Sequence, residues 1–433
     1  MAPEIIGLIG IVLLFLLILM NVHVGLALIL VGLGGYFVLA DPGAAFAQLG
    51  RTPVSTAMSY SLSVIPMFIF MGMILSMSGF AQDLYRAVDK WGGHFTGGIG
   101  MSTIGASAVF SAISGSSSAT TATMAKVALP EMKRYEYDPK VSTACVVAGG
   151  TLGALIPPSV VLILYGVLTG ESVGQLLIGG ILPGALMTVL FMLTVYLIVK
   201  FSRDAEGKKS SRSSWRIRFS ALQRTWPFLV IFLVSIGGIF LGWFTPTEAG
   251  GVGAMSSLIV ATILGRFKMT QLLESLDESV RLTCMIFMII IGATLFSQFL
   301  AISGIPSFVS EEIIRWGLNP YVVLAAILIA LFILGMFMEG VSILVLTLPI
   351  IYPLVTGLGF DGVWFGIVMV LVVNVGLMTP PLGLNVFIVK GIAKDIPIED
   401  IFKGVIPMIV AVFVCLFILI VFPHFVTFLP SFM

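Results

Sequence analysis

The chain has 433 residues, of which 58% are hydrophobic and only 10% charged, and its mean hydropathy is +1.13. A soluble domain carries about 25% charged residues, so this composition excludes a soluble enzyme, a nucleic-acid-binding protein and a disordered chain. The formal net charge of +1 indicates no special partner. Cys145, Cys284 and Cys415 are scattered through apolar runs, which favours neither disulfides nor a metal cluster. We therefore predict an all-α polytopic membrane protein embedded in a lipid bilayer.

Candidate membrane spans are the apolar stretches of about 20 residues, the length that crosses a bilayer. They cover residues 4–21, 22–40, 61–80, 141–168, 175–200, 226–244, 247–265, 282–302, 362–389 and 404–425. No basic residue precedes the first, so we predict a retained helix and not a cleaved signal peptide. Stretches 94–130 and 320–350 are interrupted by polar or small residues, the first over Ser114–Thr121 and the second around Gly335 and Glu339-Gly340. We predict that both are re-entrant hairpins, because irregular backbone at membrane depth needs protein or water around it.

The basic residues predict the orientation. With both hairpins re-entrant, loops 81–93, 131–140, 200–225, 266–281 and 390–403 share one face and hold 19 of the 22 Lys and Arg residues. Only Arg51 and Arg315 lie opposite, and Lys126 lies inside the first hairpin. The basic face is therefore predicted to be cytoplasmic, with both termini periplasmic, in a bacterial inner membrane. Residues 200–225 are interpreted as a solvated basic linker helped by anionic headgroups, with a regulatory docking site as the alternative.

Glycine, proline and Ser-Gly positions also recur along the chain at a nearly constant offset, which indicates two similar halves. The matched pairs, with their offsets, are Gly25 and Gly250 (225), Ser78-Gly79 and Ser303-Gly304 (225), Leu129-Pro130 and Leu348-Pro349 (219), Gly153 with Pro157-Pro158 and Gly376 with Pro380-Pro381 (223), and Pro183 and Pro407 (224). We divide the chain into a first repeat (1–199), a linker (200–225) and a second repeat (226–433). The predicted topology inverts the two repeats, and inverted repeats with paired broken helices are typical of secondary transporters with a midplane site.

Two proline pairs predict that helices 141–168 and 362–389 are discontinuous. Each pair removes two backbone N–H donors and disfavours helix just before it, so carbonyl groups lose their partners. Free carbonyls at membrane depth can bind Na⁺, and the helix end that follows each break favours an anion. The alternative interpretation of each break is a simple kink without a ligand.

Polar side chains near these breaks are the candidate substrate ligands. The hydroxyl run from Ser114 to Thr123 could bind ions or substrate oxygens, or could simply let helices pack closely. Glu339 is the one acid at apparent membrane depth, which makes it a functional candidate by default; it could instead cap a half-helix. Glu248 is interpreted as part of a helix start, because Pro246 and an acid in the first turn fit a helix cap. The residues expected to contact substrate are Ser117, Ser118, Thr120, Glu339 and Asn385.

Four motifs in these segments resemble the large membrane subunit of tripartite ATP-independent periplasmic (TRAP) transporters of the dicarboxylate and sialic acid type. They are Ser114-Gly-Ser-Ser-Ser-Ala-Thr120, Gly149-Gly-Thr-Leu-Gly-Ala-Leu-Ile-Pro-Pro-Ser159, Thr245-Pro-Thr-Glu-Ala249 and Gly376-Leu-Met-Thr-Pro-Pro-Leu-Gly-Leu-Asn385. The resemblance covers essentially the whole chain. It implies an elevator fold, in which a transport domain of hairpins and broken helices slides against a scaffold.

The resemblance further implies partners and sodium sites. The partners are a small four-helix membrane subunit, expected on a separate chain, and a periplasmic substrate-binding protein. One sodium site would use Ser114 or Ser116 with Gly153, Ile156 and Pro158, and the other would use Gly335 with Gly376, Thr379 and Leu382. The expected activity is sodium-driven uptake of an organic acid anion, such as a C4-dicarboxylate or sialic acid.

Two other functions compete with this one. A stand-alone ion and organic-anion symporter of similar architecture would need no binding protein. An intramembrane hydrolase would use a hairpin serine, but the predicted topology brings none of the three histidines near Ser114–Ser118 to act as a base. The sequence therefore favours a transporter over an enzyme.

Overall fold

The computed structural model describes residues 2–20, 22–202, 207, 212–223, 225–315 and 317–433, and within these ranges every regular element is a helix. Arg203, Lys208, Lys209 and Arg224 of the predicted basic linker lie outside the described residues. The elements of the first half are α1 (Pro3–Leu19), α2 (Val24–Leu39), α3 (Pro42–Ala57), η1 (Tyr60–Ser63), α4 (Val64–Met77), α5 (Phe80–Gly92), α6 (Gly98–Ser114), α7 (Ser117–Arg134), α8 (Pro139–Thr151), η2 (Leu152–Ala154), α9 (Val160–Thr169), α10 (Val173–Gly179) and α11 (Ile181–Phe201).

The second half is equally helical. Its elements are α12 (Trp215–Gln223), α13 (Trp226–Phe240), α14 (Pro246–Ile263), α15 (Met269–Ser303), α16 (Ile305–Arg315), α17 (Pro320–Gly335), α18 (Gly340–Gly357), α19 (Gly362–Gly376), α20 (Leu384–Ile392), α21 (Ile398–Val421), α22 (His424–Thr427) and η4 (Pro430–Phe432). The described chain holds five stretches long and apolar enough to cross a membrane: Tyr60–Met77, Val173–Phe201, Met269–Ser303, Gly340–Gly357 and Ile398–Val421. Shorter apolar helices accompany them, so the predicted all-α polytopic membrane protein is confirmed.

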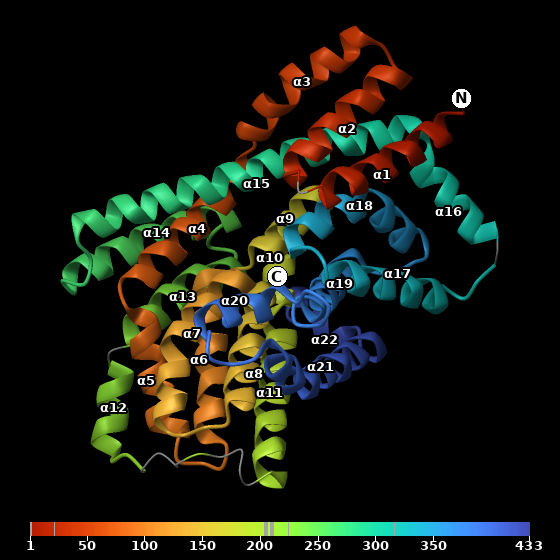
Figure 1. Cartoon of the computed structure of the whole chain (residues 1–433). Coiled ribbons are helices and arrows are strands. Elements are labelled where there is room, and N and C mark those ends of the chain that lie inside the picture. The colour runs from red at the N-terminus through yellow and green to blue at the C-terminus, as the bar shows by residue number, and fades with distance from the viewer. Residues whose placement is uncertain (1, 21, 203–206, 208–211, 224, 316) are drawn as a thin grey trace.

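Helices α1, α2, α4, α13, α14 and α15 pack against one another and form a body that we call the scaffold. The long helix α15 crosses this body, with α1–α3 gathered toward its C-terminal end and α4 and α14 toward its N-terminal end (Figure 1). Glycines permit the close approach of α2 to α15, since a Cβ at Gly32 would lie only 2.7 Å from the Phe296 amide nitrogen. Such close backbone contact is how membrane helices gain packing energy. Helix α14 begins at Pro246, as expected, and its start is a capping box in which Thr245 and Glu248 bond each other's backbone nitrogens.

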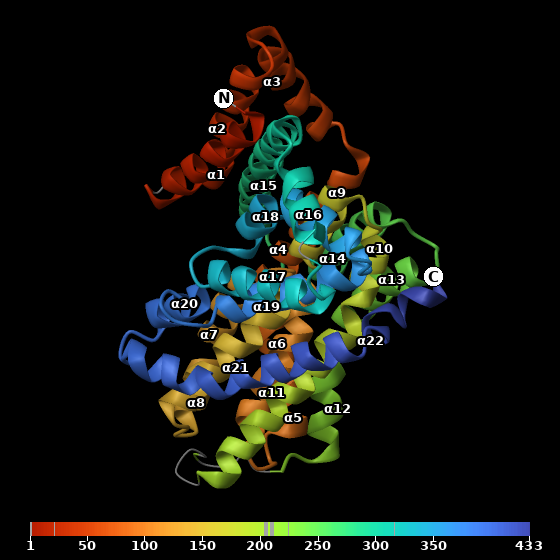
Figure 2. The same cartoon turned by 90° about the vertical axis from the view of Figure 1, so that its right-hand side faces the viewer.

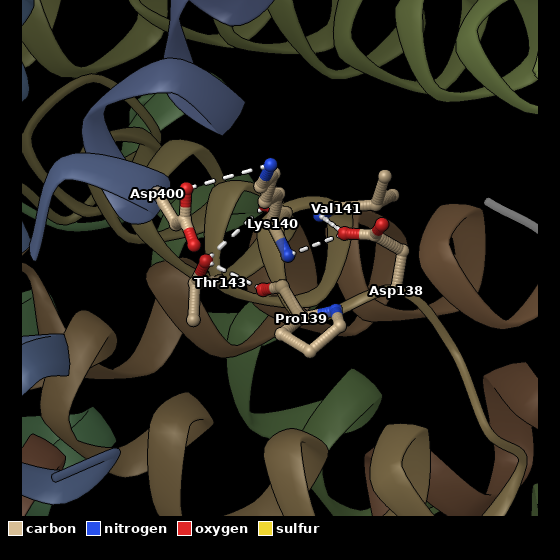
Figure 3. Close-up of polar contacts among 6 residues, drawn as sticks. All are labelled: Asp138, Pro139, Lys140, Val141, Thr143 and Asp400. Atoms are coloured by element: carbon tan, nitrogen blue, oxygen red, sulfur yellow. Dashed lines mark hydrogen bonds and ion pairs between the residues drawn. The ribbon is translucent and has the colours of Figure 1, made fainter. Parts of the chain in front are cut away.

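The second body, which we call the hairpin body, contains α6–α11 and α17–α22. Helix α21 lies across α8 and α11 in both views (Figures 1 and 2). Lys140 at the start of α8 forms an ion pair with Asp400 of α21 at 3.4 Å, and Asp138 caps α8 by accepting from the Lys140 amide at 2.6 Å (Figure 3). A second ion pair, 2.8 Å long, joins Lys133 of α7 to Asp395 after α20. The two halves of the sequence are therefore interleaved within one body.

The scaffold is connected to each hairpin through a matched Ser-Gly pair. Gly79 separates α4 from α5 and Gly304 separates α15 from α16, with φ angles of 78° and 73° that favour glycine. The preceding serines are both buried, and each hydroxyl bonds a carbonyl three residues back, Ser78 at 2.9 Å and Ser303 at 2.8 Å. The repeat seen in the sequence is thus a repeat of local structure at these two junctions.

The two interrupted stretches form helix pairs with short tips. In the first, α6 ends at Ser114 and α7 already begins at Ser117, so most of the predicted break is helical, which corrects our expectation for Ser114–Thr121. The reason is that Ser116 caps α7 and the Thr121 hydroxyl bonds the Ser117 carbonyl at 2.8 Å, so hydroxyl groups are satisfied inside the helix. In the second, residues 336–339 separate α17 from α18, as expected.

Other boundaries differ from the predictions. The span predicted at 282–302 begins at Met269, because residues 269–281 continue the helix as an amphipathic extension and not as a loop. Helix α3, over the polar stretch after residue 41, was absent from our expectations. Both predicted discontinuous helices are broken: α8 gives way to η2 and α9, and α19 ends at Gly376 before α20 begins at Leu384.

Candidate substrate and ion site

A cavity of about 320 Å³ lies where the two hairpin tips meet the two broken helices and the scaffold. The hairpins contribute residues near Ser116 and Glu339, and the broken helices contribute Ala154, Val160, Asn374 and Asn385. The scaffold contributes α4 and α15. The polar side chains that line the cavity are Ser76, Ser114, Ser116, Ser117, Ser118, Thr123, Glu278, Glu339, Asn374 and Asn385.

The first hairpin tip is a tight turn stabilised by its own hydroxyl groups. Gly115 has a φ of 60°, a left-handed conformation that lets α7 start two residues later. Ser116 accepts a hydrogen bond from the Ala119 amide at 3.4 Å, and its hydroxyl lies 3.2 Å from that of Ser118. The Ser114 hydroxyl donates to the Ser116 carbonyl at 3.3 Å. It is also hydrogen-bonded to Thr120, which is fully buried behind the tip.

The first broken helix contacts this tip directly. Because Pro157 and Pro158 have no N–H group, the Gly153 and Ala154 carbonyls lack the donors that a continuous helix would supply. The Ser159 hydroxyl satisfies Ala154 at 2.6 Å. A Cβ at Gly153 would lie 2.5 Å from the Ser116 carbonyl oxygen, so the Gly153 backbone lies against the hairpin tip.

The tip and the start of α9 are joined as well. The Val160 amide donates to the Gly115 carbonyl at 3.1 Å, and a Cβ at Gly115 would meet the Pro158 carbonyl oxygen at 2.5 Å. The structure therefore brings Ser114, Ser116, Gly153 and Pro158 into one small region. Ile156 is half-buried and packs against Gly184 of α11.

The second broken helix packs against the second hairpin through two glycines. A Cβ at Gly376 would lie 2.8 Å from the Gly335 carbonyl oxygen, which leaves no room for a side chain. Here the carbonyl groups freed by Pro380 and Pro381 find new donors, since Gly376 accepts from the Thr379 amide and Leu377 accepts from the Asn385 amide, both at 3.0 Å.

The region around the Gly335–Gly376 contact, the second region, is more exposed than the first region around Ser116 and Gly153. The Thr379 hydroxyl bonds the Val375 carbonyl at 2.7 Å, and the Leu382 side chain is 46% exposed. Gly335 and Gly376 are therefore in contact, whereas Leu382 stands at the surface. In the first region, by contrast, Pro158 and Ser159 are buried.

Asn385 joins the two halves at the cavity wall. Its side-chain nitrogen donates to the Ser117 hydroxyl at 2.9 Å, and both side chains are buried. Its side-chain oxygen is buried without a hydrogen-bond partner among the described residues, as is that of Asn374. Two unsatisfied amide oxygens beside one cavity are unusual, because such groups normally find a donor.

Of the predicted substrate residues, Ser117, Ser118, Glu339 and Asn385 line the cavity, and Thr120 does not. Of the predicted ion ligands, Ser114 and Ser116 line it, and the remaining residues lie outside its wall: Gly153, Ile156, Pro158, Gly335, Gly376, Thr379 and Leu382. Glu339 is the N-cap residue of α18, but its side chain forms no capping hydrogen bond. The simple capping role considered for it is therefore wrong.

Two residues that line the cavity were not predicted from the sequence. Glu278 was assigned to a cytoplasmic loop, but α15 extends past it and its side chain reaches the cavity. Asn374 was not among the predicted site residues, although an amide within an apolar run was the signal that could have revealed it. The cavity thus presents two carboxylates, and none of its described lining residues is Lys or Arg.

The two broken helices also face each other across a narrow space lined by Thr151 and Asn374, Leu152 and Val375, and Leu155 and Met378. The members of each pair are 223 positions apart, the offset found for the proline pairs. An internal repeat brings matched residues together in this way where its symmetry axis passes.

The fold and the cavity define a polytopic helical membrane protein with a polar site built from broken helices. The family model of the tripartite ATP-independent periplasmic transporter, DctM component, matches residues 11–425. The chain therefore belongs to this family, as its motifs predicted, and it is a TRAP transporter large permease of the multi-pass inner-membrane type.

Individual relatives agree with this membership. The chain is 34% identical to the C4-dicarboxylate TRAP transporter large permease protein DctM of Pseudomonas aeruginosa, over 87% of this chain and 86% of that protein. It is 31% identical to the sialic acid TRAP transporter large permease protein SiaM of Vibrio cholerae, over 94% of each. The crystal structure of the Alcanivorax borkumensis YdaH transporter resembles the fold with a TM-score of 0.64 at 12% identity, covering 89% of this chain and 90% of that one.

Proposed function

We propose that this chain carries out sodium-gradient-driven uptake of an organic acid anion, a C4-dicarboxylate, sialic acid or a similar carboxylate. The observation that carries the proposal is the cavity between the hairpin tips and the broken helices. Its hydroxyl and amide groups, with Ser117, Ser118 and Asn385 foremost, can donate to carboxylate oxygens. The helix starts at Ser117 and Gly340 add positive dipole ends beside it.

Charge balance favours coupling to a cation. An anion that enters a cavity containing Glu278 and Glu339 would be repelled unless positive charge enters with it. Sodium ions supply that charge, and hydroxyl and carbonyl oxygens are suitable ligands for a hard cation. We assign one ion to Ser114, Ser116, Gly153, Ile156 and Pro158; all but Ile156 lie at or against the first tip. We assign the other to Gly335, Gly376, Thr379 and Leu382.

The proposed movement is that of an elevator, in which the hairpin body slides against the scaffold. The matched junctions at Gly79 and Gly304 support it, because a left-handed glycine between two helices can absorb changes in backbone angle. The cavity lies at the boundary of the two bodies, so sliding would move its contents relative to the membrane.

The orientation and partners are proposals too. The basic residues support a cytoplasmic position for the α5, α12 and α20–α21 ends, with both termini in the periplasm. The tripartite, periplasmic description of the family supports two partners. These are a small membrane subunit and a periplasmic binding protein that delivers the anion.

Reconstitution tests the proposal. Proteoliposomes with the chain, the small subunit and the binding protein should accumulate radiolabelled succinate or sialic acid under an inward sodium gradient. Accumulation should stop when a sodium ionophore collapses the gradient. Uptake that continues without the gradient, or needs ATP, would contradict sodium coupling. Uptake by the chain alone would instead identify a stand-alone symporter.

A further inference from the structure

A second polar cavity, of about 370 Å³, lies between α5 and α12, away from the site described above. We call it the α5–α12 groove. Its lining residues are Asp83, Arg86, Lys90, Arg216, Ile217, Ser220 and Ala221. The two helices lie side by side in Figures 1 and 2, at the end of the molecule opposite α3.

The groove carries positive charge that the described protein does not neutralise. Arg86 and Arg216 are exposed and form no ion pair with any residue that the structure describes. Lys90 lies 3.5 Å from its neighbour Asp89. Asp83 is the one acid among the lining residues, and it is already paired with Arg266. A groove with two unpaired arginines is a suitable site for an anion.

An aromatic cluster borders the same helices. Trp91 of α5 packs edge-on against Trp215 and Phe219 of α12, with ring centroids 6.1 and 5.9 Å apart. Trp215 is 60% exposed and Phe219 58% exposed, so both keep an open apolar face. Arg218, 6% exposed, lies 5.3 Å from the Trp215 ring centroid, and two of its guanidinium nitrogens have no hydrogen-bond partner in the part of the chain that the structure describes. Exposed aromatic rings beside basic residues are typical of the membrane–water interface.

We propose that the α5–α12 groove binds the headgroup of an anionic phospholipid. Arg86, Lys90 and Arg216 would hold the phosphate and headgroup oxygens, while Trp215 and Phe219 contact the upper acyl chain. The occupant is a lipid and not a free phosphate ion because α12 leads directly into the apolar helix α13, which places the groove at headgroup depth. In the proposed orientation the lipid belongs to the cytoplasmic leaflet; the binding chemistry itself does not depend on transport.

The position of the groove gives the lipid a specific effect. Helix α5 lies between α4 of the scaffold and α6 of the first hairpin, directly after Gly79. A lipid bound between α5 and α12 therefore holds α5 to α12, which is part of the linker 200–225. The composition of the membrane thereby acts on the helix that connects the two bodies.

Lipid binding to the purified full chain tests this inference. Delipidated protein in detergent is titrated with dioleoylphosphatidylglycerol, dioleoylphosphatidylcholine or inorganic phosphate, and the melting temperature is followed. The anionic lipid should raise the melting temperature, and 500 mM NaCl should weaken the effect. The double variant Arg86→Gln/Arg216→Gln should bind it roughly 25-fold more weakly, since each basic residue near an anionic surface contributes about a fivefold change. The matched control Lys394→Gln/Lys403→Gln removes two exposed lysines elsewhere and should respond as the wild type does.

Each other outcome overturns the inference. Equal shifts with phosphatidylcholine would show a general detergent or bilayer effect, and an equal shift with inorganic phosphate would show an ion site without a lipid. An unchanged response of the double variant would remove these arginines from the site. If the double variant is itself unstable in phosphatidylcholine, the single variant Arg216→Gln on exposed α12 is used, and it must lose about fivefold. None of these readouts measures transport, so their failure leaves the sodium-coupled function untouched.

Discussion

The Asn385 side-chain nitrogen donates a hydrogen bond to the Ser117 hydroxyl at 2.9 Å, joining two residues that are 268 positions apart. Both side chains also line the cavity between the hairpin tips and the broken helices. One contact therefore connects the second broken helix with the first hairpin and orients two candidate substrate ligands. A change at either residue disturbs the other.

We expect Asn385→Ala and Ser117→Ala each to raise the KM for substrate. The coupling energy between them should be about 1 kcal/mol, or roughly fivefold, the net value of a buried hydrogen bond. A double-mutant cycle on initial uptake rates measures it. Ser111→Ala is the control, because that hydroxyl is buried in α6 and no described residue bonds it. Strict additivity of the two substitutions would mean that the bond does not organise the site.

Gly376→Ala should impair the second hairpin contact. The added Cβ would lie 2.8 Å from the Gly335 carbonyl oxygen, so the helices must separate, at a cost of about 1–3 kcal/mol. We expect a lower melting temperature and a weaker sodium dependence of uptake. Gly391→Ala in α20 is the matched control, because its Cβ would meet nothing within 4 Å. Wild-type sodium dependence in Gly376→Ala would argue against an ion site at this contact.

Glu278→Gln should slow release of the anion from the cavity. The Glu278 carboxylate on α15 repels an anion bound in the cavity. Removing its charge should therefore strengthen anion binding there. We expect a lower kcat for uptake and an unchanged or lower KM. Glu274→Gln, one turn earlier on the same helix and absent from the cavity lining, is the control. Identical kinetics for the two variants would exclude an electrostatic role for Glu278.

The Lys133–Asp395 ion pair predicts a pH-dependent stability difference. The hydrogen bond from Lys133 lowers the pKa of Asp395 below its ordinary 3.8, and the bond to Asp395 raises the pKa of Lys133 above 10.5. A lowered carboxyl pKa stabilises the fold above the unfolded pKa, and this contribution disappears as pH falls through the folded value. The raised lysine pKa contributes below 10.5 and is lost as pH rises through the folded value.

We therefore expect Asp395→Asn to have a slightly lower melting temperature than the wild type from about pH 5 to pH 9. The difference should shrink below the ordinary carboxyl pKa of 3.8, and also in high salt, because both groups are exposed. Thermal melts at pH 7 and pH 3 provide the measurement. If the difference in melting temperature persists at low pH, packing and not charge stabilises the contact between α7 and the segment after α20.

The sequence predicted the parts of the fold that glycine and proline determine. The two proline pairs remove donors wherever they stand, so both helix breaks were predictable. The Ser-Gly pairs were read only as part of the internal repeat, and the structure places a helix junction at each of them. Hydroxyl residues were harder to interpret. The Thr121 hydroxyl bonds the Ser117 carbonyl within α7, and only the three-dimensional surroundings decide whether such a hydroxyl ends a helix or continues it.

The cavity could be predicted only in part. Ser116, Glu339 and Asn385 belong to the hairpins and breaks, where polar groups at membrane depth stand out. Glu278 does not, because it precedes an apolar run and looks like a loop residue until α15 is known to begin at Met269. The asymmetry between the buried first region and the exposed Leu382 is likewise invisible in two nearly matching motifs.

The interleaving of the two halves also has a consequence for biosynthesis. Ser117 meets Asn385 only after 268 further residues, and Lys133 meets Asp395 only after 262. At about 5–20 residues per second, the ribosome needs tens of seconds to supply these partners. During that time the tip of the first hairpin can contact only the first broken helix and α9, and Ser117 lacks its bond to Asn385. The polar contacts that join the two halves at the cavity can therefore form only after nearly the whole chain has been synthesised.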